Sequence, residues 1–365
     1  MIVSLPAWME RRGRWTLRAG LGALGLGAMC ALFAPQAALH SYLSAFVLWA
    51  GIPLGCGAIL MMHHLVGGRW GSGIRPPMEA AAMTTPLLAV LFVPVAMGIS
   101  YLYPWASAAG GDVLTQKRAY LNVPFFLLRG SAFLLLWSAG AWFLTRRPIS
   151  RLAAPGLVLY VLTVSFAAID WIGSLEPHWY SSIFGLYVLI GQVLSALAVL
   201  IVLAAIHAGN EPSAADIFHD LGTLLLALVS LHAYFAYSQF FIIWNGNLPH
   251  EIGWYAPRIH GPWGFIALVL IAVHFALPFA LLLSRSVKRR ASSLLCVALV
   301  ILIARGVEAM WIVLPSYDGP AIGAVALSML AILGMGGIWM GIFARSWRRR
   351  EDRARAAARA EEFEA

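Results

Sequence analysis

Ten long apolar segments constrain the fold of this chain more than any other feature of its sequence. Each is close to the roughly 20 residues that an α-helix needs to cross about 30 Å of hydrocarbon. The segments are continuously apolar and do not alternate with polar residues, which excludes a closed β-barrel. We therefore predict ten transmembrane helices, over residues 15–33, 41–65, 78–102, 122–144, 154–172, 181–207, 219–244, 262–283, 292–314 and 321–344.

The composition supports a membrane location for all ten segments. The 365 residues are 61% hydrophobic and 11% charged, with a mean hydropathy of +0.80, whereas soluble domains carry about 25% charged residues. A secretory signal is the alternative for the first segment. That segment is longer than the apolar core of a signal peptide, which has about 7–15 residues, and nine more apolar segments follow it. We therefore interpret it as a transmembrane helix.

The cysteines argue against several cofactors. Cys30, Cys56 and Cys296 all lie inside apolar segments, and the sequence has no C-x-x-C or C-x-x-C-H motif. We therefore expect no disulfide, no iron–sulfur cluster and no covalently attached haem in this chain. We also expect no metal site.

The basic residues predict the orientation in the membrane. The net charge is +9, which could suggest a nucleic-acid partner. However, 20 of the 25 Lys and Arg residues fall on the side of the N-terminus, and Lys117, Arg118 and Arg258 fall on the other. The positive-inside rule then predicts that both termini are cytoplasmic. The basic tail, 346–365, is expected to be a helix near anionic lipid headgroups.

The sequence shows signs of an internal duplication with an offset of 138 residues. An acid followed seven residues later by a proline ends a helix twice, at 170–177 and at 308–315. The pattern H-x-Y-x-S-x-F begins a helix twice, at 40–46 and at 178–184. An even number of spans per unit predicts two four-helix bundles that cross the membrane in the same direction.

The predicted architecture is therefore an all-α integral membrane protein in four parts. Residues 1–39 hold helix 1, 40–177 form the first bundle with helices 2 to 5, 178–315 form the second with helices 6 to 9, and 316–365 hold helix 10 and the tail. Gly51, Gly55 and Gly57 in helix 2 are spaced to allow a close approach of another helix.

Ionisable residues within the predicted helices are the main candidates for function, since charges in hydrocarbon are costly and need a partner or a role. They fall into three layers. The cytoplasmic layer contains His63, His64 and Glu79; the middle layer contains His232 and His274; the outer layer contains Arg129, Asp170, Arg305 and Glu308.

Each bundle has one arginine and one carboxylate in its outer half. Arg305 and Glu308 share a helix face and can pair within one helix. Arg129 lies in helix 4 at a membrane depth close to that of Asp170 in helix 5. One interpretation is a pair of structural ion pairs. The other is that the carboxylates exchange protons with the outer side and the three layers form a proton route. For His63, His64 and Glu79, interfacial groups that reach the lipid headgroups are a further alternative.

Two ligand hypotheses concern the middle layer. His232 and His274 are the pair that could hold a b-type haem, although packing without a ligand is the simpler interpretation. The polar and aromatic side chains of helix 7, namely His232, Tyr234, Tyr237 and Gln239, have the chemistry that a quinone headgroup needs.

Several motifs together resemble a known family. They are H-H-L-V-G-G-R-W at 63–70, R-P-P-M-E at 75–79, Y-P-W at 103–105, D-W at 170–171, S-L-E-P-H-W-Y-S at 174–181, Y-S-Q at 237–239 and W-N-G-N-L-P at 244–249. This set resembles the ActF subunits of bacterial alternative complex III, which are similar to the NrfD-type membrane subunits.

The resemblance implies a ten-helix subunit of a quinol:electron acceptor oxidoreductase in the bacterial inner membrane, which delivers electrons to an acceptor of the cytochrome c type. It implies an ActC-like membrane partner, which carries the quinol site, and partner subunits with iron–sulfur clusters and haem c. In this chain it implies no redox cofactor and a possible proton path through His63, His64, Glu79, Asp170 and Glu308. Aspartate is usual in the family where this sequence has Glu308, a departure that keeps the charge.

Three functional hypotheses follow. The first is a cofactor-free subunit that anchors redox partners and conducts protons. The second is a subunit that itself binds quinol, as NrfD and ActC do. The third is a transporter that acts alone, which the sequence disfavours because it shows no paired Gly- or Pro-interrupted helices in the two halves.

Overall fold

The computed structural model describes residues 3–107, 117–146, 150–208 and 214–364, and these form helices and connecting loops without a strand. The first half contains α1 (Ala7–Ala31), α2 (Pro35–Val66), α3 (Arg69–Ala82), α4 (Leu87–Met97), α5 (Ile99–Leu102), α7 (Val123–Arg146) and α8 (Ala153–Trp171). The second half contains α9 (Phe184–Ala208), α10 (Ala215–Gly246), α11 (Pro249–Ile259), α12 (Gly261–Leu270), α13 (Leu277–Leu283), α14 (Arg285–Arg289), α15 (Ala291–Val313) and α16 (Ala321–Glu364).

Short 3₁₀ turns and one π-helical turn complete the described elements. The 3₁₀ turns are η1 (Pro104–Ala106), η2 (Ser150–Leu152), η3 (Gly173–Leu175) and η6 (Leu314–Ser316), and the π-helical turn is η5 (Ile271–Ala276). Because α12, η5 and α13 follow one another without a break, they make one continuous span.

Eight of the described spans are long and apolar enough to cross a membrane, and a bent pair of helices would make a ninth. This confirms a multi-pass all-α membrane protein. The first predicted helix forms as α1, but it carries arginines through its first half and is not among the eight. The predicted single helix at 78–102 is wrong in detail, because the chain bends by 42° between α3 and α4.

The bend between α3 and α4 has a local cause. Pro86 lies at the break, immediately before α4, and has no N–H to donate to a preceding carbonyl. Thr84 and Thr85 instead donate their side-chain hydroxyls to the carbonyls of Ala81 and Ala82 at 2.6 Å. These bonds satisfy the end of α3 and allow α4 to start in a new direction.

The centre of the molecule is the contact between α2 and α9, the two most buried spans. Both helices also pack against α8 and α15. A Cβ atom added to Gly55 would lie 2.4 Å from the carbonyl oxygen of Gln192 on α9. The predicted close helix approach is therefore confirmed at Gly51 and Gly55, since Gly51 also faces Gln192. It is wrong for Gly57, because a Cβ atom there would meet no atom within 4 Å.

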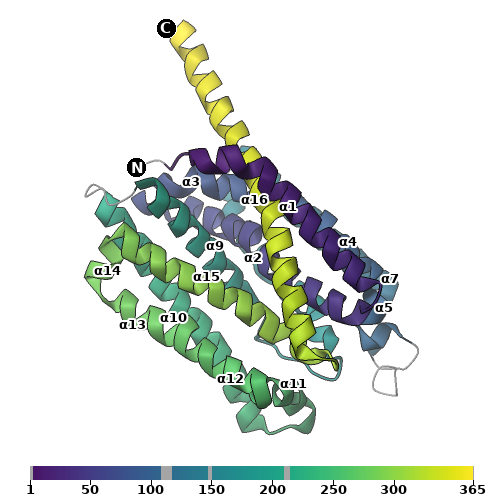
Figure 1. Cartoon of the computed structure of the whole chain (residues 1–365). Helices are drawn as coiled ribbons and strands as arrows, with labels where there is room; N and C mark the ends of the chain where they lie inside the picture. Colours follow the sequence, from purple (N-terminus) through teal and green to yellow (C-terminus); the bar gives the residue numbers. More distant parts are fainter. Residues whose placement is uncertain (1–2, 108–116, 147–149, 209–213, 365) are drawn as a thin grey trace.

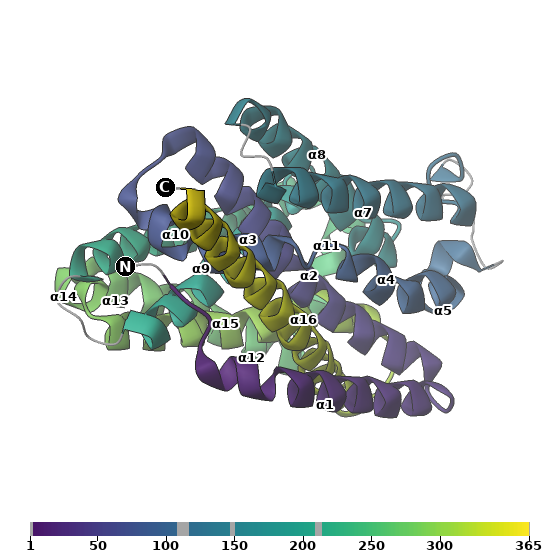
Figure 2. The same cartoon turned by 90° about the horizontal axis from the view of Figure 1, so that it is seen from above.

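α1 lies along α16 on one side of this centre (Figures 1 and 2). Their backbones touch at glycines: a Cβ on Gly20 would lie 2.5 Å from the Gly334 oxygen, and one on Gly337 would lie 2.5 Å from the Thr16 oxygen. Small residues at such spacing let membrane helices approach closely. The end of α16 projects away from the bundle (Figure 1), so the basic tail is helical as predicted but does not turn across the bundle.

The remaining spans form the periphery. α7, α10 and the span from α12 to α13 bury less than a third of their most apolar windows. Large apolar side chains such as Leu135, Phe265 and Leu268 are exposed on them. These faces are suited to contact with lipid or with another membrane subunit.

Candidate functional site

Four ionisable side chains from three elements converge inside the second half of the chain. Glu308 of α15 accepts hydrogen bonds from Arg305 on the same helix and from the hydroxyl of Tyr187 on α9. The carboxylate also lies 3.3 Å from a ring nitrogen of His232 on α10 and 3.3 Å from a ring nitrogen of His274 on η5. We call Arg305, Glu308, His232 and His274 the polar cluster.

The Arg305 guanidinium is held by the neighbouring central helix. Its Nε donates to Ser195 Oγ at 3.2 Å, and its Nη1 lies 3.2 Å from His232 Nε2. Gly191 provides the space, because a Cβ there would lie 2.5 Å from Nη2. The predicted ion pair between Arg305 and Glu308 is therefore confirmed. The Arg305 guanidinium also contacts α9 and α10, and these two contacts were not predicted from the sequence.

His274 is presented by an irregular turn. Residues 271–276 form the π-helical turn η5, with one extra residue in the turn compared with an α-helix. Such turns occur often at functional sites, because they re-aim one side chain without ending the helix. His274 is 6% exposed, and its Nε2 has no hydrogen-bond partner among the described atoms. A buried polar atom of this kind calls for a ligand or water.

A cavity of about 970 Å³ borders the polar cluster. Most of its wall is apolar or aromatic, from side chains such as Phe184, Phe240, Trp254 and Phe275. His232, His274 and Glu308 form one polar part of the wall. A volume of this size, with few convergent polar groups, is typical of a site for an apolar ligand with a polar head.

The cavity opens between α10 and α12. Tyr237 on α10 and Phe265 on α12 both line it, and both are more than 60% exposed. All four residues predicted for a quinone site, His232, Tyr234, Tyr237 and Gln239, lie in its wall. Gln239 is buried, and its side-chain oxygen accepts a hydrogen bond from Ser181.

The helix α11 closes one end of the cavity with Trp254, Tyr255 and Ile259. Arg258 on the same helix is 0% exposed and holds it in place. Its guanidinium donates to Glu176 at 2.7 Å and to the Ile312 carbonyl at 2.8 Å, and it lies 3.9 Å from the ring centre of Trp254. Burial lowers the pKa of Arg258, and the Glu176 carboxylate opposes that shift.

A metal ion and a haem both fit this cluster poorly. Ligand atoms of His232, His274 and Glu308 lie within 4.8 Å of one another, close enough for a metal. The guanidinium already bound to Glu308, however, would repel a divalent cation. The two imidazole rings have centres only 5.0 Å apart and both contact Glu308, so they do not frame a space for a porphyrin.

The carboxylate predicted for the outer half of the first bundle, Asp170, is enclosed. Arg129 donates to both oxygens of Asp170, at 2.7 and 3.0 Å, which confirms the predicted pair. The Arg129 guanidinium lies 3.8 Å from the ring centre of Tyr120. Asp170 is 0% exposed and its neighbour Trp171 packs against Phe92. The arrangement is that of a structural ion pair that joins α7 to α8.

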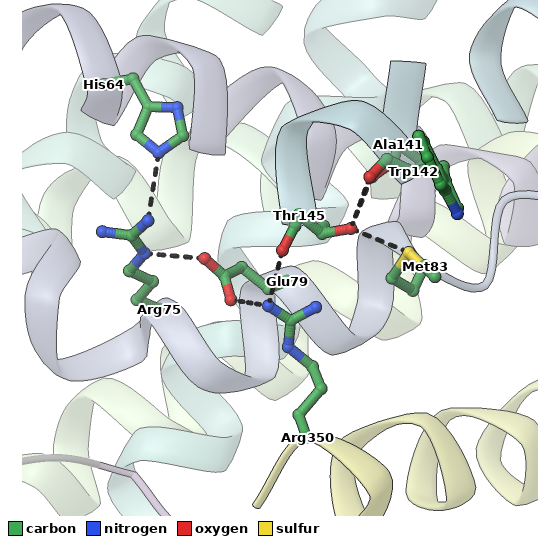
Figure 3. A network of polar contacts seen from close by, with 8 residues as sticks. All are labelled: His64, Arg75, Glu79, Met83, Ala141, Trp142, Thr145 and Arg350. Carbon is green, nitrogen blue, oxygen red and sulfur yellow. Dashed lines mark hydrogen bonds and ion pairs between the residues drawn. The ribbon is translucent and has the colours of Figure 1, made fainter. Parts of the chain in front are cut away.

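Glu79 is the centre of a separate network at the end of α3 (Figure 3). Arg75 donates to one oxygen of Glu79 at 2.7 Å, and Arg350 of α16 donates to the other. Arg350 also donates to the Thr145 carbonyl at 3.2 Å, and Arg75 lies 3.4 Å from His64 Nε2. This network fastens the long C-terminal helix to α3 and α7.

His63 is held apart from that network. Its Nε2 lies 3.1 Å from the Gly68 carbonyl, and its ring packs edge-on against Trp70. In the part of the chain that the structure describes, we find no hydrogen bond that joins the Glu79 network, the Asp170 pair and the polar cluster. The predicted division into layers is therefore wrong in part. The middle-layer residues His232 and His274 join Arg305 and Glu308, which were predicted for the outer layer, in one polar cluster. The other outer-layer pair, Arg129 and Asp170, forms a cluster of its own.

Sequence reasoning missed several members of the site. Tyr187, Trp254 and Tyr255 are aromatic residues in an aromatic-rich chain, and nothing in the local pattern distinguishes them. The grouping of His274 with Glu308 depends on the π-helical turn. The W-N-G-N-L-P motif at 244–249 does mark the turn into α11, where Asn247 adopts a left-handed conformation with φ of 48°.

The described fold and site define a multi-pass all-α membrane protein with a buried polar cluster beside an apolar cavity. Comparison of the sequence with models of known protein families and with curated proteins gave no match.

Proposed function

We propose that this chain is an integral membrane subunit of a quinol:electron acceptor oxidoreductase of the alternative complex III type, and that it binds the quinol headgroup in its own cavity. One observation supports the proposed quinol site. The buried residues His232, His274 and Glu308 lie in the wall of an apolar cavity of about 970 Å³ that opens toward the lipid-exposed face. Quinols are apolar molecules with two polar oxygens at one end, and they arrive from the lipid.

The proposed membership of the complex depends on the motifs at 63–79, 103–105, 170–181 and 237–249. In such a complex the electrons leave the quinol for iron–sulfur and haem c groups of partner subunits. The broad apolar faces of α7, α10 and α12, and the projecting helix α16, offer surfaces for those partners.

The proposed architecture is a duplication. The unit from α2 to α8 corresponds to the unit from α9 to α15, with their first helices in contact at the centre. Asp170 and Glu308 occupy corresponding positions, and each binds an arginine. The arginines differ in origin, since Arg129 comes from the neighbouring helix and Arg305 from the same helix as its partner.

The other two hypotheses have less support. A proton route across the chain would need links between the Glu79 network, the Asp170 pair and the polar cluster. A stand-alone transporter would need interruptions at corresponding places in the two halves. The bend between α3 and α4 lies in the second span of the first unit, whereas η5 lies in the third span of the second unit.

Two experiments test the two parts separately. The full chain in lipid nanodiscs is irradiated with an azido-quinone probe, and labelled peptides are mapped. We expect labels on α10, α11 and η5 that excess decylubiquinone prevents; labelling that excess quinone does not prevent would contradict the quinol site. Affinity purification from native membranes tests the complex, and we expect iron–sulfur and haem c subunits to copurify; a chain recovered alone would contradict it.

A further inference from the structure

We propose that His274 makes the cavity select the reduced quinol over the oxidised quinone, an inference that rests on the proposed quinol site. It follows from the hydrogen-bonding roles that the polar cluster leaves to each nitrogen of that imidazole. A hydroquinone has hydroxyl groups that can donate a hydrogen bond, whereas a quinone carbonyl can only accept one.

Glu308 determines which nitrogen of His274 carries the proton. Its carboxylate accepts hydrogen bonds from the Tyr187 hydroxyl and from the permanently charged Arg305 guanidinium. An ionised carboxylate has acceptor sites only. His274 Nδ1, 3.3 Å from the carboxylate, is therefore the nitrogen that carries the proton.

The charges already present in the polar cluster keep the His274 imidazole neutral. Arg305 and Glu308 already form a neutral pair within the buried polar cluster, where both are less than 5% exposed. A positively charged imidazole would add a third charge without a counter-charge in apolar surroundings, which is strongly unfavourable. A neutral imidazole with its proton on Nδ1 leaves Nε2 as an acceptor.

The Nε2 acceptor of His274 is open to a ligand in the cavity. His274 Nε2 is buried and has no partner among the described atoms, and His274 is part of the cavity wall. His232 does not compete, because its Nε2 already lies within reach of Arg305 and Glu308. A ligand in the cavity can therefore satisfy His274 Nε2 only by donating a hydrogen bond.

Gln239, another residue of the cavity wall, offers a different hydrogen-bonding group. Ser181 donates to the side-chain oxygen of Gln239, which leaves the amide NH₂ of Gln239 as a donor. An NH₂ donor serves a hydroxyl oxygen and a carbonyl oxygen alike. His274 is thus the discriminating contact, and Gln239 is the contact that both redox forms share.

The experiment measures the affinity of the full chain in nanodiscs for decylubiquinol and for decylubiquinone, under anaerobic conditions, by quenching of tryptophan fluorescence. Trp254 and Trp311 in the cavity wall provide the signal. A neutral hydrogen bond is worth about 1 kcal/mol, so we expect the quinol to bind roughly fivefold more tightly than the quinone.

Two variants separate the roles. His274→Phe keeps the ring shape without nitrogens, and we expect the quinol to lose its advantage so that the two affinities become equal. The matched variant Gln239→Leu should weaken both forms by a similar factor and preserve the ratio. Equal affinity of the unchanged chain for the two forms would overturn the inference and leave the quinol site intact. No binding of either form would overturn the proposed site as well.

Discussion

Asp170 and Glu308 are 138 residues apart in the sequence, and each accepts a hydrogen bond from a buried arginine, but their surroundings differ. Glu308 forms part of a cavity wall and contacts two histidines, whereas Asp170 is fully enclosed beside Arg129 and Trp171. The Arg129–Asp170 pair thus serves packing, whereas Glu308, bound to Arg305, forms part of the polar wall of a cavity that a ligand can enter.

Substitution of Gly191 tests whether the position of the Arg305 guanidinium matters for quinol binding. In Gly191→Ala the new methyl group would lie 2.5 Å from the guanidinium, which must move away from Ser195 and His232. Because a hydrogen bond to a charged group contributes about 1.5–3 kcal/mol, we expect quinol affinity to fall tenfold or more. Fluorescence quenching measures this affinity. Gly57→Ala is the control, since no atom lies within 4 Å of its new Cβ, and an equal loss in both variants would refute a specific role of Arg305.

Substitution of Arg258 tests whether this residue holds α11 against the end of the cavity. Arg258→Met removes the bonds to Glu176 and Ile312, and loss of one member of a buried ion pair lowers stability by about 3 kcal/mol. We expect faster hydrogen–deuterium exchange across 249–259, with the central helices α2 and α9 unaffected. Arg118→Met is a control with an exposed arginine. Unchanged exchange in Arg258→Met would show that α11 is held by other contacts.

The burial of two tyrosines outside the membrane spans predicts that the folded state loses stability at alkaline pH. Burial raises the pKa of Tyr103 and of Tyr255 above the usual value near 10. The folded state therefore disfavours the phenolate, and stability present below about pH 10 is lost as the pH rises further. Thermal unfolding between pH 8 and 11 should show a falling Tm, and Tyr103→Phe should reduce the fall. A Tm that does not change over this range would contradict the burial of both phenols.

Much of this fold was predictable, because continuous apolar segments of about 20 residues have few alternatives to membrane helices. The ion pairs at Asp170 and Glu308 were also predictable, since a buried charge needs a partner. The bend at Pro86 and the π-helical turn around His274 were not, because neither has a distinctive periodicity. Whether a carboxylate borders a cavity depends on long-range packing, which local sequence does not encode.

Substitution of Arg350 tests whether this residue attaches the C-terminal helix α16 to α3 and α7. Arg350→Ala removes the ion pair with Glu79 and the bond to the Thr145 carbonyl. We expect the end of α16 to become more sensitive to trypsin while the membrane body remains intact. The control is Arg355→Ala, an exposed arginine one and a half turns further along. Equal protease sensitivity of the two variants would contradict the fastening role of the Glu79 network.

The most direct test of the central claim compares Glu308→Gln with Asp170→Asn in the azido-quinone labelling experiment. Both changes neutralise a buried carboxylate bound to arginine, so both should lower thermal stability. We predict that Glu308→Gln abolishes protectable labelling of α10, α11 and η5, and that Asp170→Asn retains it. Equal labelling in the two variants would contradict a quinol site at the polar cluster.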